Sequence, residues 1–222
     1  SAQITQLAAK TLADNKHIIV CGYGKTGQTV GKILETENVN FIAIETDPEI
    51  IRAARGVGEP VEFGDATRSE LLVAAGLKRA MALVVTFSSY QNTLRILQHV
   101  KMMRPELPVI VRSRDNSTRD ALVKAGADEV IQDVFEAALM LGSYALICSG
   151  VPLKQAFLVT RGMREERYSL LKGFFGGAKE EDDVQKDGED VLIYPVRIPE
   201  ESDSVGKTLA ELKLVDPFVV VT

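Results

Sequence analysis

The sequence has no tryptophan, two cysteines and two histidines among its 222 residues. Cys21 and Cys148 lie far apart, so they indicate neither a disulfide framework nor a zinc site, and we expect a reducing, cytosolic setting. No run reaches the roughly 20 apolar residues that a membrane-spanning helix needs. The net charge of −5 and the lack of a basic run disfavour nucleic acid as a partner.

Side chains that enzymes use for acid–base or nucleophilic catalysis are also scarce. His17 opens the first apolar run and His99 falls within a predicted helix, and neither belongs to a Cys–His, Ser–His–Asp or Tyr-x-x-x-Lys arrangement. A dehydrogenase would also need a substrate domain and a proton donor beside its nicotinamide. We therefore expect a chain that binds a ligand and does not transform it.

What the sequence does contain is an alternation of short apolar runs and helical patterns, within an ordinary composition of 45% hydrophobic and 26% charged residues. We predict strands over 17–21, 40–44, 60–63, 81–86, 108–112 and 129–131, and helices over 26–36, 48–55, 67–75, 89–103, 116–125 and 134–149. This order predicts an α/β fold, a Rossmann-like doubly wound parallel sheet of six strands with helices on both faces.

The most informative motif joins the first two predicted strands. The first runs directly into Gly22-x-Gly24-x-x-Gly27 and a helix, and the second ends on the acidic Glu45. This is the dinucleotide-binding fingerprint, in which the glycines make a tight turn, let a phosphate approach the backbone and let the helix pack closely. The helix N-terminus attracts phosphate, and Glu45 can accept hydrogen bonds from both ribose hydroxyls. The alternative is a glycine-rich turn that has lost its ligand.

Three further strand ends carry polar residues suited to the same edge of the sheet. Asp65 and Thr67 can cap the helix that follows, either alone or while the turn also contacts an adenine. Thr86 opens a hydroxyl-rich loop. Arg112 can bind phosphate bidentately, or it can form a salt bridge with Asp65 or Asp115.

The remaining segments predict parts beyond the sheet. Segment 134–149 is apolar almost all round, which predicts a helix that is covered on every side. A second helix over 153–172 completes a helix-turn-helix arm, covered either by a partner's arm in a dimer or by internal packing. We divide the chain into a linker helix (1–15), a nucleotide-binding domain (16–133), the arm (134–172), a Gly-rich acidic linker (173–190) and the start of a small α+β lobe (191–222), and we expect a piece of a longer protein.

With these motifs identified, the chain resembles an RCK domain, also called a KTN or TrkA-type domain, a cytosolic nucleotide-sensing module of potassium channels and transporters. The likeness rests on I-I-V-C-G-Y-G-K-T-G (18–27), I-E-T-D-P-E (44–49), F-G-D-A-T (63–67), V-I-V-R-S-R-D (109–115) and G-A-D-E-V-I (126–131). The phrase V-R-I-P-E-E-S-D-S-V-G-K-T-L-A-E-L (196–212) resembles the opening of the RCK C-terminal lobe. The arm is most similar to that of KefB/KefC-type antiporters.

The resemblance implies a homodimer that binds NAD(H) or an adenine mononucleotide (AMP, ADP or ATP) and gates a K⁺ or cation/proton transport domain, without catalysis. It places the domain on the cytoplasmic face of the inner membrane, as part of a membrane protein. The residues expected at the ligand are Gly22, Tyr23, Gly24, Lys25, Thr26, Gly27, Glu45, Thr46, Asp47, Asp65, Ala66, Thr67, Thr86 and Arg112. Two alternatives stay open: a soluble TrkA-like subunit of a separate membrane protein, and a fragment of an NAD-dependent oxidoreductase.

Overall fold

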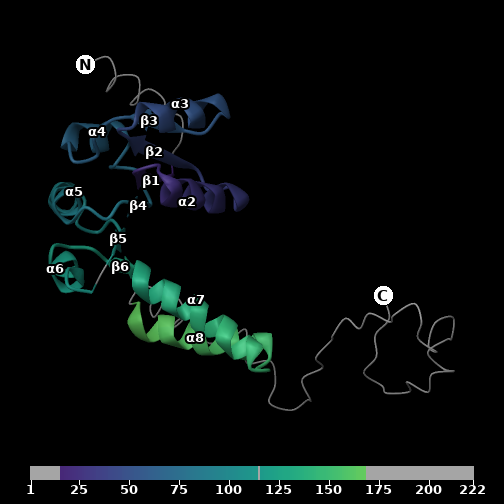
Figure 1. The fold of residues 1–222 in the computed structure, drawn as a ribbon. Coiled ribbons are helices and arrows are strands. Elements are labelled where there is room, and N and C mark those ends of the chain that lie inside the picture. The colour runs from purple at the N-terminus through teal and green to yellow at the C-terminus, as the bar shows by residue number, and fades with distance from the viewer. Residues whose placement is uncertain (1–15, 115, 169–222) are drawn as a thin grey trace, which may run out of the picture. The chain divides into compact units, whose positions relative to one another are not determined.

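The computed structural model describes residues 16–114 and 116–168, which contain a six-stranded parallel sheet (Figure 1). Its strands are β1 (Ile18–Cys21), β2 (Phe41–Glu45), β3 (Val61–Phe63), β4 (Ala82–Val85), β5 (Val109–Ser113) and β6 (Glu129–Gln132). Their order in the sheet is β3-β2-β1-β4-β5-β6, and β1 pairs with both β2 and β4. This is the Rossmann order, whose switch point lies between β1 and β4, and it confirms the predicted fold class.

Helices connect consecutive strands, and two more follow the sheet. They are α2 (Lys25–Thr36), α3 (Pro48–Gly56), α4 (Ser69–Ala74), α5 (Tyr90–Met103), α6 (Arg119–Lys124), α7 (Asp133–Cys148) and α8 (Leu153–Arg167). Side chains of α4, α5 and α6 pack on one face of the sheet, and those of α2 and α3 pack on the other. The two faces alternate along each strand, as a pleated sheet buried on both sides requires.

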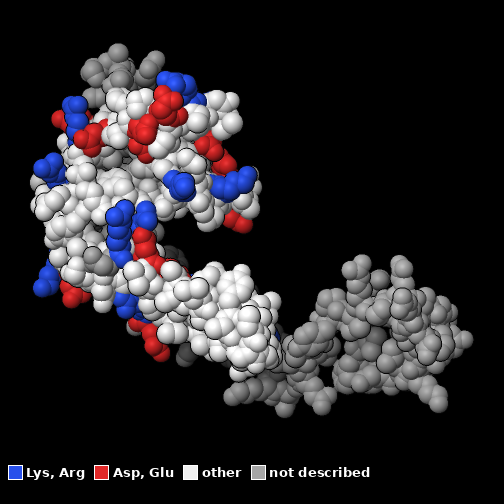
Figure 2. Space-filling view, in the orientation of Figure 1, with Lys and Arg blue, Asp and Glu red and all other residues white. Residues whose placement is uncertain are grey.

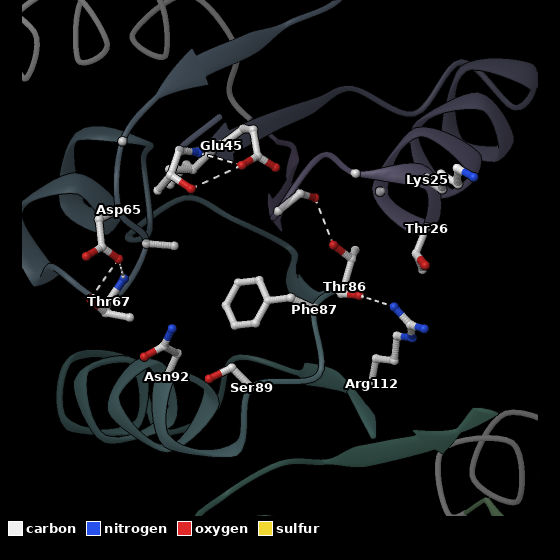
Figure 3. A pocket seen from close by; sticks show the side chains of 17 residues that line it. Lys25, Thr26, Glu45, Asp65, Thr67, Thr86, Phe87, Ser89, Asn92 and Arg112 are labelled. Atoms are coloured by element: carbon white, nitrogen blue, oxygen red, sulfur yellow. Dashed lines mark hydrogen bonds between the residues drawn. The ribbon is translucent and has the colours of Figure 1, made fainter. Parts of the chain in front are cut away.

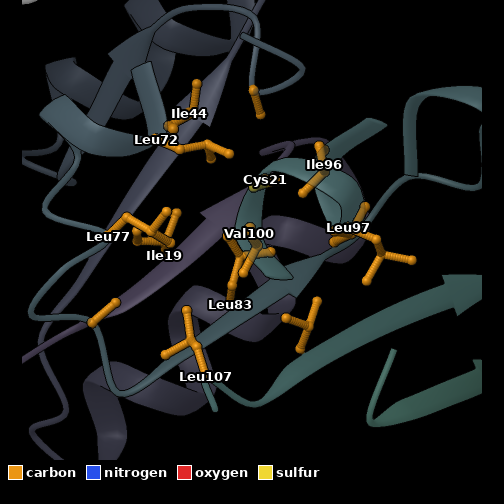
Figure 4. Close-up of a cluster of buried hydrophobic side chains, with 14 of the residues drawn as sticks. Ile19, Cys21, Ile44, Leu72, Leu77, Leu83, Ile96, Leu97, Val100 and Leu107 are labelled. Carbon is orange, nitrogen blue, oxygen red and sulfur yellow. The ribbon is translucent and has the colours of Figure 1, made fainter. Parts of the chain in front are cut away.

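The larger of the two hydrophobic clusters lies under α4 and α5 (Figure 4). Ile19 and Leu83 come from the central strands, and Leu97 and Val100 face them from α5. Cys21 is fully buried here, and burial raises the pKa of its thiol to about 12. Cys21 therefore packs as a small neutral hydrophobe.

Three predicted helices differ from the structure by more than one residue at an end, and the other four differ by a single residue. The helix predicted over 67–75 begins at Ser69, because Asp65 accepts hydrogen bonds within a turn that precedes the helix. The helix predicted over 116–125 begins at Arg119. The helix predicted over 153–172 ends at Arg167, because Tyr168 has an extended backbone (φ −100°, ψ 119°). The predicted segments 1–15, 173–190 and 191–222, and the predicted helix end at 169–172, lie outside the described residues.

The helices α7 and α8 form a hairpin, which we call the arm, and they contact each other after a turn at Gly150, where φ is +90°. The sequence predicted that α7 is covered on every side. In the single chain only Leu139 and Ser143 of this helix are buried, whereas Leu141 is 72% exposed. The side of the arm seen in Figure 2 carries few charges. The described residues of one chain therefore leave this apolar surface uncovered.

Candidate functional site

A pocket of about 560 Å³ lies at the carboxyl ends of the central strands (Figure 3). It opens where the strand order reverses, which is where doubly wound sheets bind their ligands. Its lining comes from turns that are far apart in the sequence: Gly22, Gly24, Lys25, Thr26, Gly27, Ile44, Glu45, Thr46, Gly64, Asp65, Ala66, Thr67, Thr86, Phe87, Ser89, Asn92 and Arg112.

Two of the fingerprint glycines are required by packing within the protein. Gly22 has a φ of +94°, and a Cβ there would lie 2.8 Å from Oγ1 of Thr86. A Cβ on Gly27 would lie 2.2 Å from the carbonyl oxygen of Gly22. The structure therefore confirms that Gly22 makes the turn and that Gly27 lets α2 pack against the end of β1.

Gly24 is different, because a Cβ there would meet no atom within 4 Å and its φ is −62°. Nothing in the protein's own packing requires a glycine at this position. A side chain would instead project into open space beside Lys25 and Thr26, where the first N–H groups of α2 have no partner within the helix. This end of the pocket is suited to an anion, since the helix N-terminus also carries a partial positive charge.

Glu45, at the end of β2, is held by backbone donors on both oxygens. Its Oε2 accepts a hydrogen bond from the N–H of Tyr23 at 2.6 Å, and its Oε1 accepts from the N–H groups of Thr46 (2.6 Å) and Asp47 (2.9 Å). Each carboxylate oxygen accepts about two hydrogen bonds. Glu45 can therefore accept one further hydroxyl at Oε2, whereas accepting two hydroxyls would require a backbone bond to open.

Tyr23 and Asp47 were predicted at the ligand, but neither lines the pocket. The Tyr23 ring is fully buried below α2 and stacks on Phe41, with 6.0 Å between the ring centroids. Asp47 caps α3, since its Oδ1 accepts a hydrogen bond from the N–H of Glu49 at 2.9 Å. Tyr23 contributes to the site only through its backbone.

The turn after β3 forms the opposite wall of the pocket. Asp65 Oδ1 accepts hydrogen bonds from the N–H (2.9 Å) and the hydroxyl (2.7 Å) of Thr67. The sequence allowed Asp65 and Thr67 to cap α4, but the residue at the N-cap is Arg68, with no side-chain bond to the helix. Asp65 thus shapes the turn, and the buried Ala66 forms part of the wall.

The residues after β4 contribute more to the pocket than the sequence indicated. Thr86 is buried, and its hydroxyl donates to the Gly22 carbonyl at 2.8 Å, which fixes the glycine turn. The ring of Phe87 lies in the middle of the pocket (Figure 3). Ile44, Gly64, Phe87, Ser89 and Asn92 line the pocket but were missing from the predicted set. A T-F-S-S loop at a strand end was a signal for Phe87 and Ser89, but the direction of each side chain could not be deduced.

Arg112, at the end of β5, forms a salt bridge with Asp133 and not with the suggested Asp65, whereas Asp115, the other suggested partner, lies outside the described residues. The Nε and Nη2 of Arg112 donate to the carboxylate of Asp133, the first residue of α7, at 2.8 and 2.7 Å. Its Nη1 donates to the Thr86 carbonyl at 3.1 Å. The hydrogen bonds to Asp133, with its charge, raise the pKa of Arg112 further, so the guanidinium stays charged.

The histidine nearest the sheet lies away from the pocket. His17 is buried before β1, and its Nε2 is 2.7 Å from the carbonyl oxygen of Ala75. Within residues 16–114 and 116–168, no three His, Cys, Asp or Glu side chains form a group that could hold a metal ion. In the same ranges no helix combines the length and the apolar character that crossing a membrane requires.

Comparison with protein families gives one match, and it covers the sheet. The model of the TrkA-N domain matches residues 18–133. The chain belongs to the TrkA-N family. The chain is 34% identical over 199 residues to a protein named as the K(+) efflux antiporter KefB of Alkalimonas amylolytica, and the match covers 90% of the chain and 30% of that protein. It is 33% identical over 138 residues to the glutathione-regulated potassium-efflux protein KefC of Escherichia coli O157:H7, covering 62% of the chain and 22% of that protein. The chain thus spans less than a third of either relative.

Solved structures share the fold. The AMP-bound Kef C-terminal domain of Shewanella denitrificans superposes with a TM-score of 0.59 at 25% identity, over 73% of this chain and 98% of that one. The TrkA-N domain of the Escherichia coli inner membrane protein ybaL gives a TM-score of 0.54 at 23% identity, over 56% and 93% of the two chains. The NAD-bound GsuK channel gives a TM-score of 0.50 at 20% identity, over 59% and 23%.

Proposed function

We propose that this TrkA-N domain binds an adenine nucleotide and thereby regulates K⁺ transport by a membrane domain, in a K⁺/H⁺ antiporter of the Kef type. The observation that carries the proposal is the open space at Gly24. That position is glycine although a Cβ there would meet no described residue within 4 Å, and the space lies at the N-terminus of α2 beside Lys25 and Arg112. A phosphate is the ligand that such a space accommodates best.

The other walls of the pocket supply the remaining contacts of a nucleotide. The ribose lies at Glu45, which can accept one hydroxyl without losing a backbone bond. The base lies toward Asp65, Ala66 and Thr67, and Phe87 offers it an aromatic face. The negative charge of Glu45 repels a 2′-phosphate, so NADP is excluded.

The relatives support the same reading. KefB and KefC are named as potassium-efflux proteins, and the Kef domain from Shewanella denitrificans was solved with AMP. Because the chain spans 30% and 22% of the two antiporters, the cation pathway belongs to a part of the protein that this chain does not include. The domain then acts as a sensor on the cytoplasmic face of that membrane protein and not as an enzyme.

The arm supports a homodimer. Several large apolar residues of the arm are exposed in one chain, among them Val134 (68%), Leu141 (72%) and Tyr144 (62%). Between α7 and α8 lies a cavity of about 500 Å³ whose lining is almost entirely apolar. On the sheet, Val84 and Ile110 point to the face that α2 covers only in part, and both are only half-buried. A second copy of the arm would cover surfaces that the described part of one chain leaves open to water.

Titration calorimetry with AMP, ATP, NAD and NADP tests the binding part of the proposal. We expect AMP, ATP or NAD to bind with measurable heat and NADP to bind more weakly than each ligand that binds. Tighter binding of NADP than of all the others would contradict the role of Glu45. If none of the four ligands binds, the pocket is not a nucleotide site.

A further inference from the structure

Arg112 lines the proposed phosphate end of the pocket, but its guanidinium is already paired with the carboxylate of Asp133. A guanidinium has five N–H donors. The Nε donor, one on Nη2 and one on Nη1 are occupied, the first two by the same carboxylate of Asp133. Asp133 therefore holds the side-on fork made by Nε and Nη2, and one donor remains on each of the two terminal nitrogens.

We infer that Asp133 is a built-in competitor that sets how tightly the pocket holds the phosphate of its ligand. The inference rests on the proposed function, because it needs a phosphate in the pocket. With Asp133 attached, the pair Arg112–Asp133 contributes no net charge toward the pocket. A phosphate that binds Arg112 through Nε and Nη2 has to displace the carboxylate, so the free energy of the ion pair weakens the binding of that phosphate.

The exchange is possible because Asp133 has a second stabilising environment. It is the first residue of α7, where a carboxylate interacts favourably with the helix N-terminus. The side chains of Arg112 and Asp133 are 31% and 35% exposed, so water can also solvate Asp133 once it is released. Arg112 likewise keeps its bond to the Thr86 carbonyl, which holds it at the end of β5 during the exchange.

The same exchange carries ligand binding to the arm. Arg112 belongs to the sheet and Asp133 to the first turn of α7, so a phosphate that takes Arg112 removes one link between the two. Coupling of this kind is reciprocal. Whatever draws Asp133 away from Arg112, such as a movement of the arm, will tighten the binding of nucleotide by the same factor.

The helix α7 also offers a matched control. Glu136 lies one turn below Asp133 and forms the same kind of pair, with Arg164 of α8 at 2.9 Å. The exposed fractions of its side chains, 30% and 32%, are close to those of the first pair. Neither Glu136 nor Arg164 lines the pocket. Asp133→Asn and Glu136→Gln therefore remove the same charge from the same helix, but only the first frees Arg112.

Calorimetry of the wild-type chain, Asp133→Asn and Glu136→Gln with AMP and with adenosine tests the inference. Exposed ion pairs are weak, so we expect Asp133→Asn to bind AMP about 3- to 5-fold more tightly. Adenosine, which has no phosphate, should bind wild type and Asp133→Asn alike, and Glu136→Gln should match the wild type for both ligands. In an Arg112→Ala background, adding Asp133→Asn should bring no gain in AMP affinity, because the guanidinium for which Asp133 and the phosphate compete is then absent.

An AMP affinity of Asp133→Asn that equals or falls below the wild-type value overturns the inference, as does an equal gain for adenosine. Should Asp133→Asn fail to fold, Asp133→Ser, which keeps a good residue at the start of the helix, takes its place in the same comparison. Failure of the proposed function gives a different result, since the wild-type chain would then bind neither AMP nor adenosine.

Discussion

Gly24 and Gly27 lie three residues apart, and each is a glycine for a different reason. A Cβ on Gly27 would overlap the backbone of the first turn, whereas a Cβ on Gly24 would meet nothing within 4 Å. Gly27 is therefore required by the folding of the domain, whereas we propose that Gly24 leaves space for a ligand. Two other residues of the pocket also have contacts within the protein. Phe87 packs partly on the core, and Arg112 binds Asp133 of another element.

Replacing each of these glycines should separate stability from binding. We expect Gly24→Val to lose at least tenfold in AMP affinity, because the side chain fills the space for phosphate, while its melting temperature stays within about 4 °C of wild type. Gly27→Ala should instead lower the free energy of unfolding by about 1 to 3 kcal/mol, as overpacking does. Calorimetry and thermal melts measure both effects. A Gly24→Val domain that binds AMP like the wild type would show that the phosphate lies elsewhere.

At the scale of elements, the arm exposes more apolar surface than is usual for a protein that stays monomeric. Its exposed residues resemble the buried face of an interface, and α7 carries acidic residues only in its first turn. The sheet also has a partly uncovered face, where Val84 of β4 and Ile110 of β5 are only half-buried. A hairpin of two helices with an apolar surface gains stability by pairing, because burial contributes about 25 cal/mol for each Å² that leaves water.

Charging the arm should therefore separate the dimer. We expect the wild-type chain to sediment at about twice its mass of 24.2 kDa at micromolar concentration, and Leu141→Lys combined with Tyr144→Lys to sediment as a monomer. Met102→Lys is the matched control, since Met102 is also exposed and apolar (81%) but lies on α5. This control should remain dimeric. A monomeric wild type, or a dimer that survives both lysines, would contradict the assignment of the arm.

The sequence was sufficient for those elements whose signals are local. The strands were predictable because each is a short apolar run, and the three residues Gly22, Gly27 and Glu45 of the fingerprint all line the pocket. Helix ends were less predictable, since the start of α4 depends on a turn held by Asp65 and the end of α8 on the burial of Tyr168. Contacts between distant elements were not predictable at all. No local sequence pattern predicts that Arg112 pairs with Asp133. The position of the Phe87 ring in the pocket likewise depends on the direction of the backbone at the end of β4, which the sequence pattern does not give.

At the scale of the whole molecule, the fold connects a ligand pocket to an arm through one sheet. The turns after β1 and β2 surround the proposed phosphate and ribose, and Arg112 ends β5. The arm begins directly after β6, the neighbour of β5. A ligand shifts such a structure only by the difference between its affinities for two states. The contact of Arg112 with Asp133 is where that difference can arise.

Regulation should therefore be lost together with binding, while transport itself remains. We expect Gly24→Val and Arg112→Ala, placed in the full-length antiporter, to remove the response of K⁺ flux to added nucleotide, because neither variant can exchange the Arg112 contact for a phosphate. Flux without nucleotide should stay measurable, since we propose that the cation pathway lies outside this domain. The measurement is K⁺ flux in vesicles with and without AMP, with Glu136→Gln as a control that keeps the wild-type response. If both site variants lose binding of AMP and the nucleotide response persists, then the fingerprint pocket is not the regulatory site, and another part of the protein senses the nucleotide.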